Sequence, residues 1–206
     1  MRNITTLNHH SPEGHSEVLF RDVRVPASNL IGREGDGFMI AQARLGPGRI
    51  HHCMRCIGMT EVCLDLMLAR SQERKTFGKY LHQHGSIGEW IARSRIEIEQ
   101  ARLLVLKTAA MIDQAGAKGA RKEISMIKVI APNLLATVAD RAMQVFGAMG
   151  VSPDTPLADF YTGGRVLRYA DGPDEVHLQT IARLELKESA DRRMQIAQYM
   201  TPFYES

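Results

Sequence analysis

Apolar residues recur at the spacing of an α-helix along most of this chain. From Phe38 the pattern runs to Gly46-Pro47-Gly48, where we expect a break, because proline has no N–H to donate inside a helix. Proline suits the first turn of a new helix, so the next helix is expected to begin at Pro47. Three long helices are expected: from Pro47 to about Arg74, from Ser86 to a turn at 115–119, and from that turn to about Val145, with a kink at Pro132. A short helix to Tyr169, interrupted by Gly163-Gly164, and a last helix to about Lys187 are expected to follow.

Ser86 and Glu89 have the spacing of a capping box, which favours a helix start at that point. Short connections between long amphipathic helices are typical of an antiparallel bundle. We therefore predict a mainly α fold in which the three long helices and the last helix form a four-helix bundle. The first long helix carries apolar residues on more than one side, for example Ile57, Val62 and Met67, which predicts a second buried surface.

The first part of the chain has a different pattern. Residues 1–16 are polar and are expected to form a loop or an irregular end. Val18-Leu19-Phe20 and Val23-Arg24-Val25 predict two short strands, the second ended by Pro26. Because two strands do not form a stable sheet alone, we interpret them as the remnant of a β domain. The predicted organisation is this N-terminal part at 1–36, a helical bundle at 37–188 and a polar tail at 189–206.

Composition supports helices and excludes several classes of function. Apolar residues make up 44% and aromatic residues 6% of the 206 positions, a balance that favours helices over a β-sandwich. The net charge of +3 argues against a dedicated nucleic-acid binder, but it permits an anionic ligand such as coenzyme A. No apolar run approaches the roughly 20 residues of a membrane span.

Cysteine and histidine positions give two further indications. Cys53, Cys56 and Cys63 fall in one helical segment, and an odd number of cysteines indicates free thiols and a reducing intracellular compartment. His52 and Cys56 are one helical turn apart, but two ligands do not make a structural zinc site, so we expect no metal centre. A redox-sensing cysteine helix is a weaker alternative.

One stretch between two helical patterns carries a candidate for chemistry. It reads Ala-Asp-Gly-Pro-Asp-Glu-Val-His and begins at Ala170. Gly172 and Pro173 break the preceding helix, and Asp174 is expected to cap the next one. Asp171 therefore lies on a turn, where its carboxylate can face a cavity. The alternative is that Asp171 is an ordinary turn aspartate.

Three segments in order resemble the C-terminal half of the flavin-dependent acyl-CoA dehydrogenase family. Members carry an Arg-x-x-Phe-Gly stretch, a Gln-x-Phe-Gly-Gly-x-Gly stretch and a Tyr-Glu-Gly-Thr stretch with the catalytic glutamate. Here these segments read Glu-Arg-Lys-Thr-Phe-Gly-Lys at 73–79, Gln-Val-Phe-Gly-Ala-Met-Gly at 144–150, and the stretch containing Asp171. The last one resembles a subfamily with aspartate in place of the glutamate. The resemblance covers roughly Val18 to Lys187.

The resemblance implies an FAD site built from two subunits. Arg74, Thr76 and Phe77 match positions that contact the flavin pyrophosphate from a neighbouring subunit, where a guanidinium forks onto phosphate oxygens. The alternative for these residues is a solvated charge cluster. The implied assembly is a homodimer or homotetramer.

Three further residues match positions near the adenosine end of the flavin. Gln144 and Gly147 match a side chain and a backbone N–H that hold it, and Glu175 matches a position near the ribose. A helix C-cap is the alternative for Gly147, and a charged helix N-terminus is the alternative for Glu175.

The implied reaction is α,β-dehydrogenation of an acyl-CoA in fatty acid β-oxidation, with electron-transfer flavoprotein as the electron acceptor. Asp171 would take the α-proton, and Arg49 and Gly172 would contact the substrate. Some family branches place the base just before the arginine of a Leu-x-x-x-Arg pattern, a position that is Gly48 here, so Asp171 is the candidate base.

The chain also departs from the family pattern, at Ala148, Thr162-Gly163, Pro173 and Gly85. The domains that precede this half in the family are not in the given sequence, so it resembles a C-terminal portion. The rival hypothesis is therefore a non-catalytic helical assembly subunit.

Overall fold

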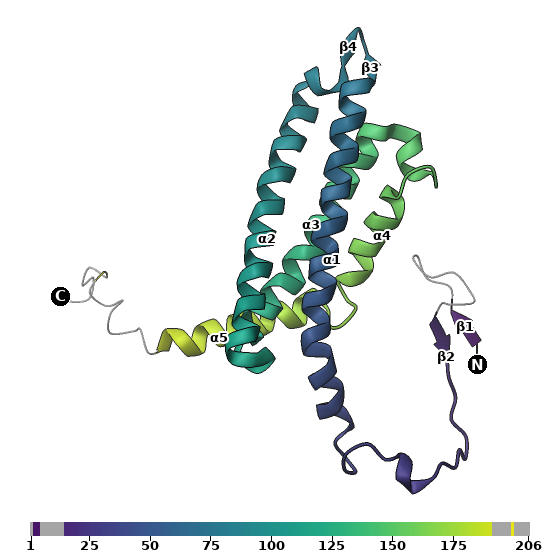
Figure 1. Cartoon of the computed structure of the whole chain (residues 1–206), viewed down its shortest axis with the longest axis vertical. Helices are drawn as coiled ribbons and strands as arrows, with labels where there is room; N and C mark the ends of the chain where they lie inside the picture. The colour runs from purple at the N-terminus through teal and green to yellow at the C-terminus, as the bar shows by residue number, and fades with distance from the viewer. Residues whose placement is uncertain (1, 5–14, 191–198, 200–206) are drawn as a thin grey trace, which may run out of the picture.

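A computed structural model of the chain describes residues 2–4, 15–190 and 199. It is mainly helical, as predicted (Figure 1). The helices are α1 (Gly37–Glu73), α2 (Gly85–Gly119), α3 (Arg121–Phe146), α4 (Leu157–Leu167) and α5 (Asp174–Ala190), with 3-10 turns at Ala27–Asn29, Leu81–Gln83 and Gly147–Val151. Short antiparallel strands pair as β1 (Arg2–Ile4) with β2 (His15–Glu17) and β3 (Lys75–Thr76) with β4 (Lys79–Tyr80).

Helix α3 lies at the centre of the bundle and packs against α1, α2, α4 and α5. The bundle is four-helical, but its fourth member is α4 and not the last helix, so that part of the prediction was wrong. In Figure 1, α5 crosses the lower part of the bundle instead of running along it. The reason is the turn before α5, which redirects the chain after α4 ends. The shared core contains Cys53, Cys56, Leu64, Met67, Ile98, Val105, Ile127, Leu135, Val138 and Leu157.

Helix α1 runs without a break through Pro47, although the sequence predicted two helices there. Proline removes a single N–H donor, while tertiary contacts hold both sides of it. Gly46 is buried against α2, where a β-carbon on it would lie 3.3 Å from Cβ of Ala117. Packing therefore overrides the local preference of proline and glycine.

Two smaller helix predictions also fail. Helix α2 begins at Gly85, and Ser86 does not cap it, because Glu89 pairs with Arg93 at 2.7 Å instead of reaching the helix start. Helix α4 continues through Gly163-Gly164. The predicted turn after α2 is confirmed, since the helical geometry is interrupted at Gly116.

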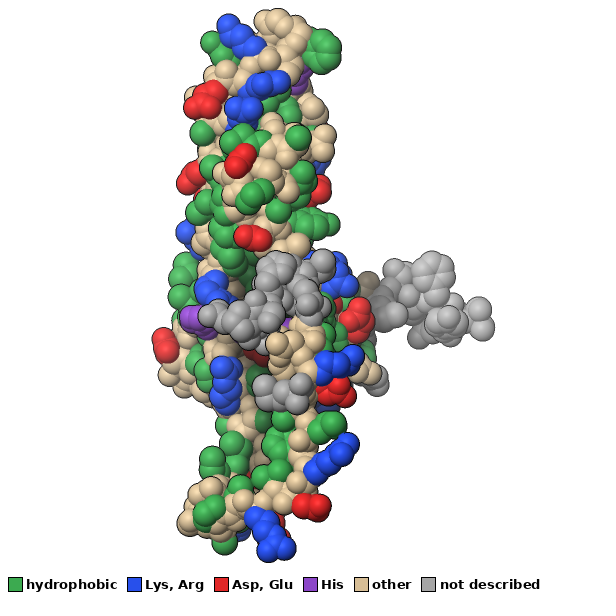
Figure 2. All heavy atoms as spheres, turned by 90° about the vertical axis from the view of Figure 1, so that its right-hand side faces the viewer, with side chains coloured by type: hydrophobic (Ala, Val, Ile, Leu, Met, Phe, Trp, Pro, Cys, Tyr) green, Lys and Arg blue, Asp and Glu red, His purple; other side chains and the backbone are tan. Residues whose placement is uncertain are grey.

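The N-terminal segment differs from the prediction. Residues 18–20 and 23–25 form no strand, and β1 and β2 lie instead mostly in the part that was expected to be a loop. A strand needs a hydrogen-bonding neighbour, and none is present for these residues within the described chain. Their side chains are exposed, Phe20 to 79%, and hydrophobic groups reach the surface toward the foot of the molecule in Figure 2. The predicted polar tail lies outside the described residues, except for residues 189 and 190, which end α5, and residue 199.

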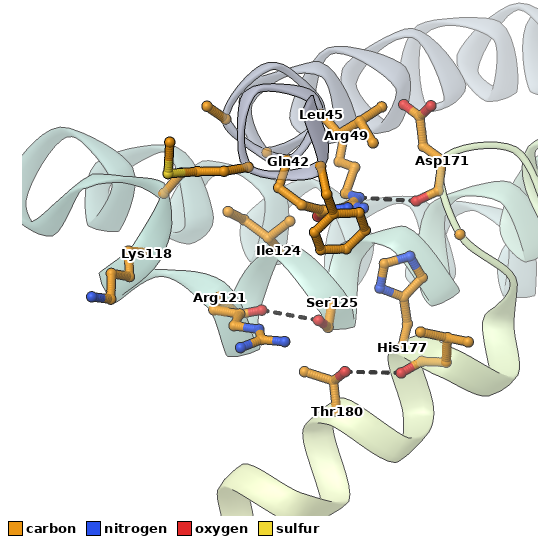
Figure 3. A pocket seen from close by; sticks show the side chains of 17 residues that line it. Gln42, Leu45, Arg49, Lys118, Arg121, Ile124, Ser125, Asp171, His177 and Thr180 are labelled. Atoms are coloured by element: carbon orange, nitrogen blue, oxygen red, sulfur yellow. Dashed lines mark hydrogen bonds between the residues drawn. The ribbon is translucent and has the colours of Figure 1, made fainter. Parts of the chain in front are cut away.

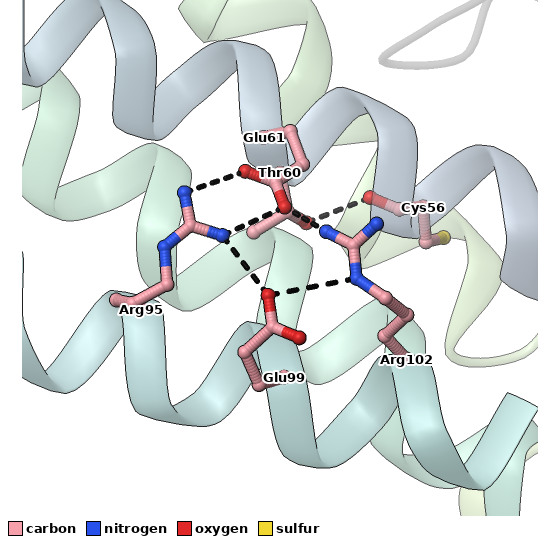
Figure 4. A network of polar contacts seen from close by, with 6 residues as sticks. All are labelled: Cys56, Thr60, Glu61, Arg95, Glu99 and Arg102. Atoms are coloured by element: carbon pink, nitrogen blue, oxygen red, sulfur yellow. Dashed lines mark hydrogen bonds and ion pairs between the residues drawn. The ribbon is translucent and has the colours of Figure 1, made fainter.

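An ionic cluster joins α1 to α2 (Figure 4). Glu61 accepts from Arg95 at 2.9 and 3.0 Å and from Arg102, while Arg95 also contacts Glu99 at 3.2 Å. Single exposed pairs contribute little, but a carboxylate shared by two guanidinium groups fixes the register of the two helices.

No described helix has the length and apolar character needed to cross a bilayer.

The contact between α4 and α3 generates a prediction on stability. A β-carbon on Gly164 would lie 2.8 Å from the backbone nitrogen of Ala136 and 3.0 Å from the carbonyl oxygen of Pro132. Gly164→Ala should therefore separate the two helices and lower the free energy of unfolding by about 1 to 3 kcal/mol in urea denaturation. Gly58→Ala, where a β-carbon meets nothing within 4 Å, should be neutral or stabilising. Equal stability of both variants would contradict the packing described here.

Candidate active site

Asp171 lies on the turn between α4 and α5, as predicted from the sequence. It has φ of 58°, a left-handed conformation that aspartate tolerates better than most residues. Gly172 follows with φ of 110°, and a β-carbon on it would lie 2.9 Å from Nε2 of His177. Glycine is therefore required at 172 both by the backbone and by the buried histidine ring. This gives Gly172 a structural role in shaping the turn.

Two cations hold the turn by its backbone. Nε of Arg49 donates to the carbonyl oxygen of Asp171 at 2.9 Å. Lys128, whose side chain is fully buried, donates to the carbonyl oxygen of Leu167 and lies 3.5 Å from that of Gly172. Burial lowers the pKa of the Lys128 ammonium, and the nearby carboxylates oppose that shift. The end of α4 and the turn are thus fixed to α1 and α3.

Asp174 has a different role from the predicted N-cap. It is the first residue of α5, and the carbonyl of Pro173 accepts the first N–H bonds, from Val176 and His177. The carboxylate of Asp174 instead accepts from Nε of Arg168 at 2.8 Å and from Nδ2 of Asn133 at 3.0 Å. The reason is burial: a carboxylate only 5% exposed is stabilised more by two side-chain donors than by a helix cap.

The carboxylate of Asp171 points away from its own carbonyl, on the other side of the turn (Figure 3). Its Oδ2 atom is 3.2 Å from Nε2 of His52 on α1. A β-carbon on Gly48 would lie 3.8 Å from the same oxygen. Two positions that are far apart in the sequence, 48 and 171, therefore adjoin in space around one carboxylate.

A groove of about 1000 Å³ opens beside this turn, between the start of α1, the α2–α3 connection and the start of α5. Its wall is mixed: Phe38, Leu45 and Ile124 are apolar, whereas Lys118 and Arg121 are cations. Arg49 lies deeper, and burial lowers the pKa of its guanidinium, with Asp171 opposing the shift. Such a groove suits a ligand with an apolar chain and anionic groups.

His177 lines the same groove and is 5% exposed. Its ring faces the carbonyl of Asp171, and burial lowers the pKa of its imidazole, with Lys128 and Arg49 adding to the effect. The ring is thus neutral at pH 7 and packs under the turn. The sequence did not single out His177, although it ends the stretch that contains Asp171.

The residues expected at the flavin pyrophosphate lie at the opposite end of α1. Arg74 follows the helix and is exposed, with no ion pair of its guanidinium among the described residues. Oγ1 of Thr76 lies 3.2 Å from Nε2 of His84, and Phe77 is 97% exposed with φ of 50°. At 1.5 Å per residue, the end of α1 is roughly 37 Å from Arg49.

Gln144 and Gly147 lie at the end of α3. Glu175 is exposed on the first turn of α5 instead, near the turn that carries Asp171. Gln144 lines a second cavity, of about 470 Å³, together with Trp90 and Arg141. The structure therefore brings Arg49, Gly172 and Asp171 together. It does not bring the six flavin candidates to them, apart from Glu175.

No prediction for Lys128 came from the sequence, and His52 was considered there only as a candidate metal ligand. A lysine inside the apolar stripe of α3 was a usable signal, because a cation on a buried face needs carbonyl or carboxylate partners. No cluster of metal-ligating side chains is present in the described part of the chain. The three cysteines are buried and free, and burial raises the pKa of each thiol to about 12, which disfavours a redox-sensing role.

Comparisons with known proteins agree with the resemblance seen in the sequence. The family described as "Acyl-CoA dehydrogenase, C-terminal domain" matches residues 35–186. Acyl-CoA dehydrogenase family member 11 of Rattus norvegicus is 58% identical over 86% of this chain, which spans 23% of that protein.

Two solved structures share the fold. Butyryl-CoA dehydrogenase from Megasphaera elsdenii has a TM-score of 0.73 and 33% identity over 82% of this chain and 43% of its own. A chain in the structure of the electron transferring flavoprotein of Acidaminococcus fermentans has a TM-score of 0.73 and 30% identity over 82% of this chain and 44% of its own. The chain thus spans less than half the length of these relatives. It belongs to the acyl-CoA dehydrogenase family, whose C-terminal domain it carries.

Proposed function

We propose that this chain is the C-terminal part of a flavin-dependent acyl-CoA dehydrogenase in which Asp171 replaces the glutamate base. One observation carries the proposal: Asp171 lies on a turn that lines the mixed groove and is fixed through its backbone, and its carboxylate lies next to Gly48. Both family positions for the base meet there, and only position 171 carries a carboxylate.

In the proposed reaction, the chain's residues bind the thioester and take its α-proton. The apolar wall at Phe38 and Leu45 would hold the acyl chain, and Lys118 and Arg121 would attract the anionic groups of coenzyme A. Arg49 keeps the turn in place through the carbonyl of Asp171, so that the carboxylate is positioned for general-base catalysis. The bound flavin would supply the hydride acceptor.

The flavin pyrophosphate would be held by Arg74, Thr76 and Phe77 of a neighbouring subunit, and its adenosine end by Gln144 and Gly147. The exposed guanidinium of Arg74, which makes no ion pair within the described part of the chain, suits a pyrophosphate. The ring of Phe77, 97% exposed on a left-handed backbone, suits a contact outside the chain. Their distance from Asp171 along α1 supports a site shared by two copies. Glu175 is proposed near the ribose, and electron-transfer flavoprotein is proposed as the electron acceptor.

The rival proposal is a non-catalytic helical assembly subunit. It is favoured by the distance between the pyrophosphate candidates and Asp171, because a single chain holds them at opposite ends of α1. A flavin absorption band in the purified protein separates the two, since the rival predicts none.

Asp171→Asn should slow flavin reduction by acyl-CoA by about 10² to 10⁴, because the amide cannot accept the α-proton. Stopped-flow absorbance of the flavin-loaded protein measures this step. Adding Gly48→Glu to Asp171→Asn should restore part of the rate, since a carboxylate at 48 reaches the same space once Arg44 shifts. A wild-type rate in Asp171→Asn would show that the base lies elsewhere.

Arg74→Ala should weaken flavin retention by about 1.5 to 3 kcal/mol, the contribution of a hydrogen bond to a charged group. Flavin content after dialysis measures the loss. Lys79→Ala, which removes another exposed cation from the same hairpin, serves as the matched control and should keep its flavin. Equal retention in both variants would remove Arg74 from the pyrophosphate site.

Sedimentation velocity should show a dimer or tetramer at micromolar concentration. The physical reason is apolar surface that the bundle does not bury, including Met54 and Val62 on α1 and Leu103 on α2, which are 57%, 42% and 64% exposed. A clean monomer would contradict both the assembly and a flavin site made by two copies.

A further inference from the structure

His52 is a described side chain at the Asp171 carboxylate that the proposed reaction does not yet use. It lies one turn after Arg49 on α1, with Nε2 at 3.2 Å from Oδ2 of Asp171. The side chains of His52 and Asp171 are 25% and 18% exposed. Oδ2 is buried and has no aligned hydrogen bond among the described residues, and the structure shows its contact with the imidazole edge of His52.

The tautomer of His52 is set by its other neighbour. Nη2 of Arg55 lies 2.6 Å from Nδ1 of His52. A guanidinium can only donate, so Nδ1 must accept. A neutral imidazole carries one proton, which therefore lies on Nε2, the atom that faces Asp171.

The charge of His52 depends on groups from three elements. Burial lowers the pKa of the imidazole, and Asp171 on the turn opposes this shift. Arg55 and His51 on α1 and Lys128 from α3 lower the pKa further. The ring is thus neutral at pH 7 and acts toward the carboxylate as an N–H dipole.

We propose that His52 is a positioning residue for Asp171: its Nε2–H, fixed by Arg55, directs one carboxylate oxygen and leaves the other to take the substrate proton. This inference rests on the proposed function for its catalytic meaning. The arrangement of the three side chains can be tested on the chain without substrate or flavin. Arg49 holds the backbone of the turn, and His52 holds the side chain.

Nitrogen NMR of the imidazole rings in the full 206-residue chain tests the arrangement. Neutral His52 should carry its proton on Nε2, and Arg55→Met should give a mixture of both tautomers. Asp171→Asn should lower the pKa of His52 further, because the carboxylate is the group that raises it. Asp65→Asn, an exposed carboxylate farther along α1, is the control and should leave that pKa unchanged. A proton on Nδ1 of neutral His52, or a His52 pKa that is the same in wild type and in Asp171→Asn, would overturn the inference.

Flavin reduction in the loaded protein tests the catalytic meaning. His52→Leu should slow flavin reduction by about 10- to 100-fold with little change in KM, because the Asp171 carboxylate would be misoriented while substrate binding is unaffected. His52→Gln keeps an N–H donor and should retain most of the rate. Asp65→Asn, the exposed control farther along α1, should match wild type.

The outcomes separate the two proposals. A slow Asp171→Asn with a wild-type rate in His52→Leu would overturn the positioning role and leave the base assignment intact. Wild-type rates in both variants would overturn the proposed function and the positioning role together.

Discussion

The site depends on one buried cation. Lys128 lies in the core of the bundle, and its ammonium must find oxygen partners there, since an unpaired buried charge is strongly destabilising. The partners are the carbonyl of Leu167 at the end of α4 and the carbonyl of Gly172 on the turn that carries Asp171. One side chain thus joins the central helix to the end of α4 and to the turn, and the backbone of Asp171 is placed as a consequence.

Other contacts build on this constraint. Arg49 holds the carbonyl of Asp171 from α1, and Asp174 joins Arg168 at the end of α4 to Asn133 on α3. The turn is therefore fixed through its backbone and its flanks, and the Asp171 carboxylate is left to contact His52 on α1. The opposite end of α1 differs, because the side chains there are not held by neighbouring elements: Arg74 and Phe77 are exposed and make few contacts within the described chain. This polarity is what a site assembled from two copies of the chain requires.

Much of the fold could be predicted from the sequence, because helical periodicity is local. The turn at Asp171 was also predictable, since Gly172 and Pro173 favour the end of a helix and the structure follows that local preference here, unlike at Pro47. The errors arose where long-range contacts decide. Packing of Gly46 carries α1 through Pro47, and the strands expected at 18–20 and 23–25 lack a neighbour. The approach of His52 and Gly48 to Asp171 depends on how α1 crosses the turn, which no spacing in the sequence encodes.

The central claim is that Asp171 removes a proton from the α-carbon of a thioester. Exchange of that proton in heavy water, followed by NMR of an acyl-CoA incubated with the flavin-loaded protein, tests this step apart from hydride transfer. We expect exchange of the α-proton with the wild-type protein and an exchange rate at least about 10²-fold lower in Asp171→Asn. Equal exchange rates in the two proteins would contradict it.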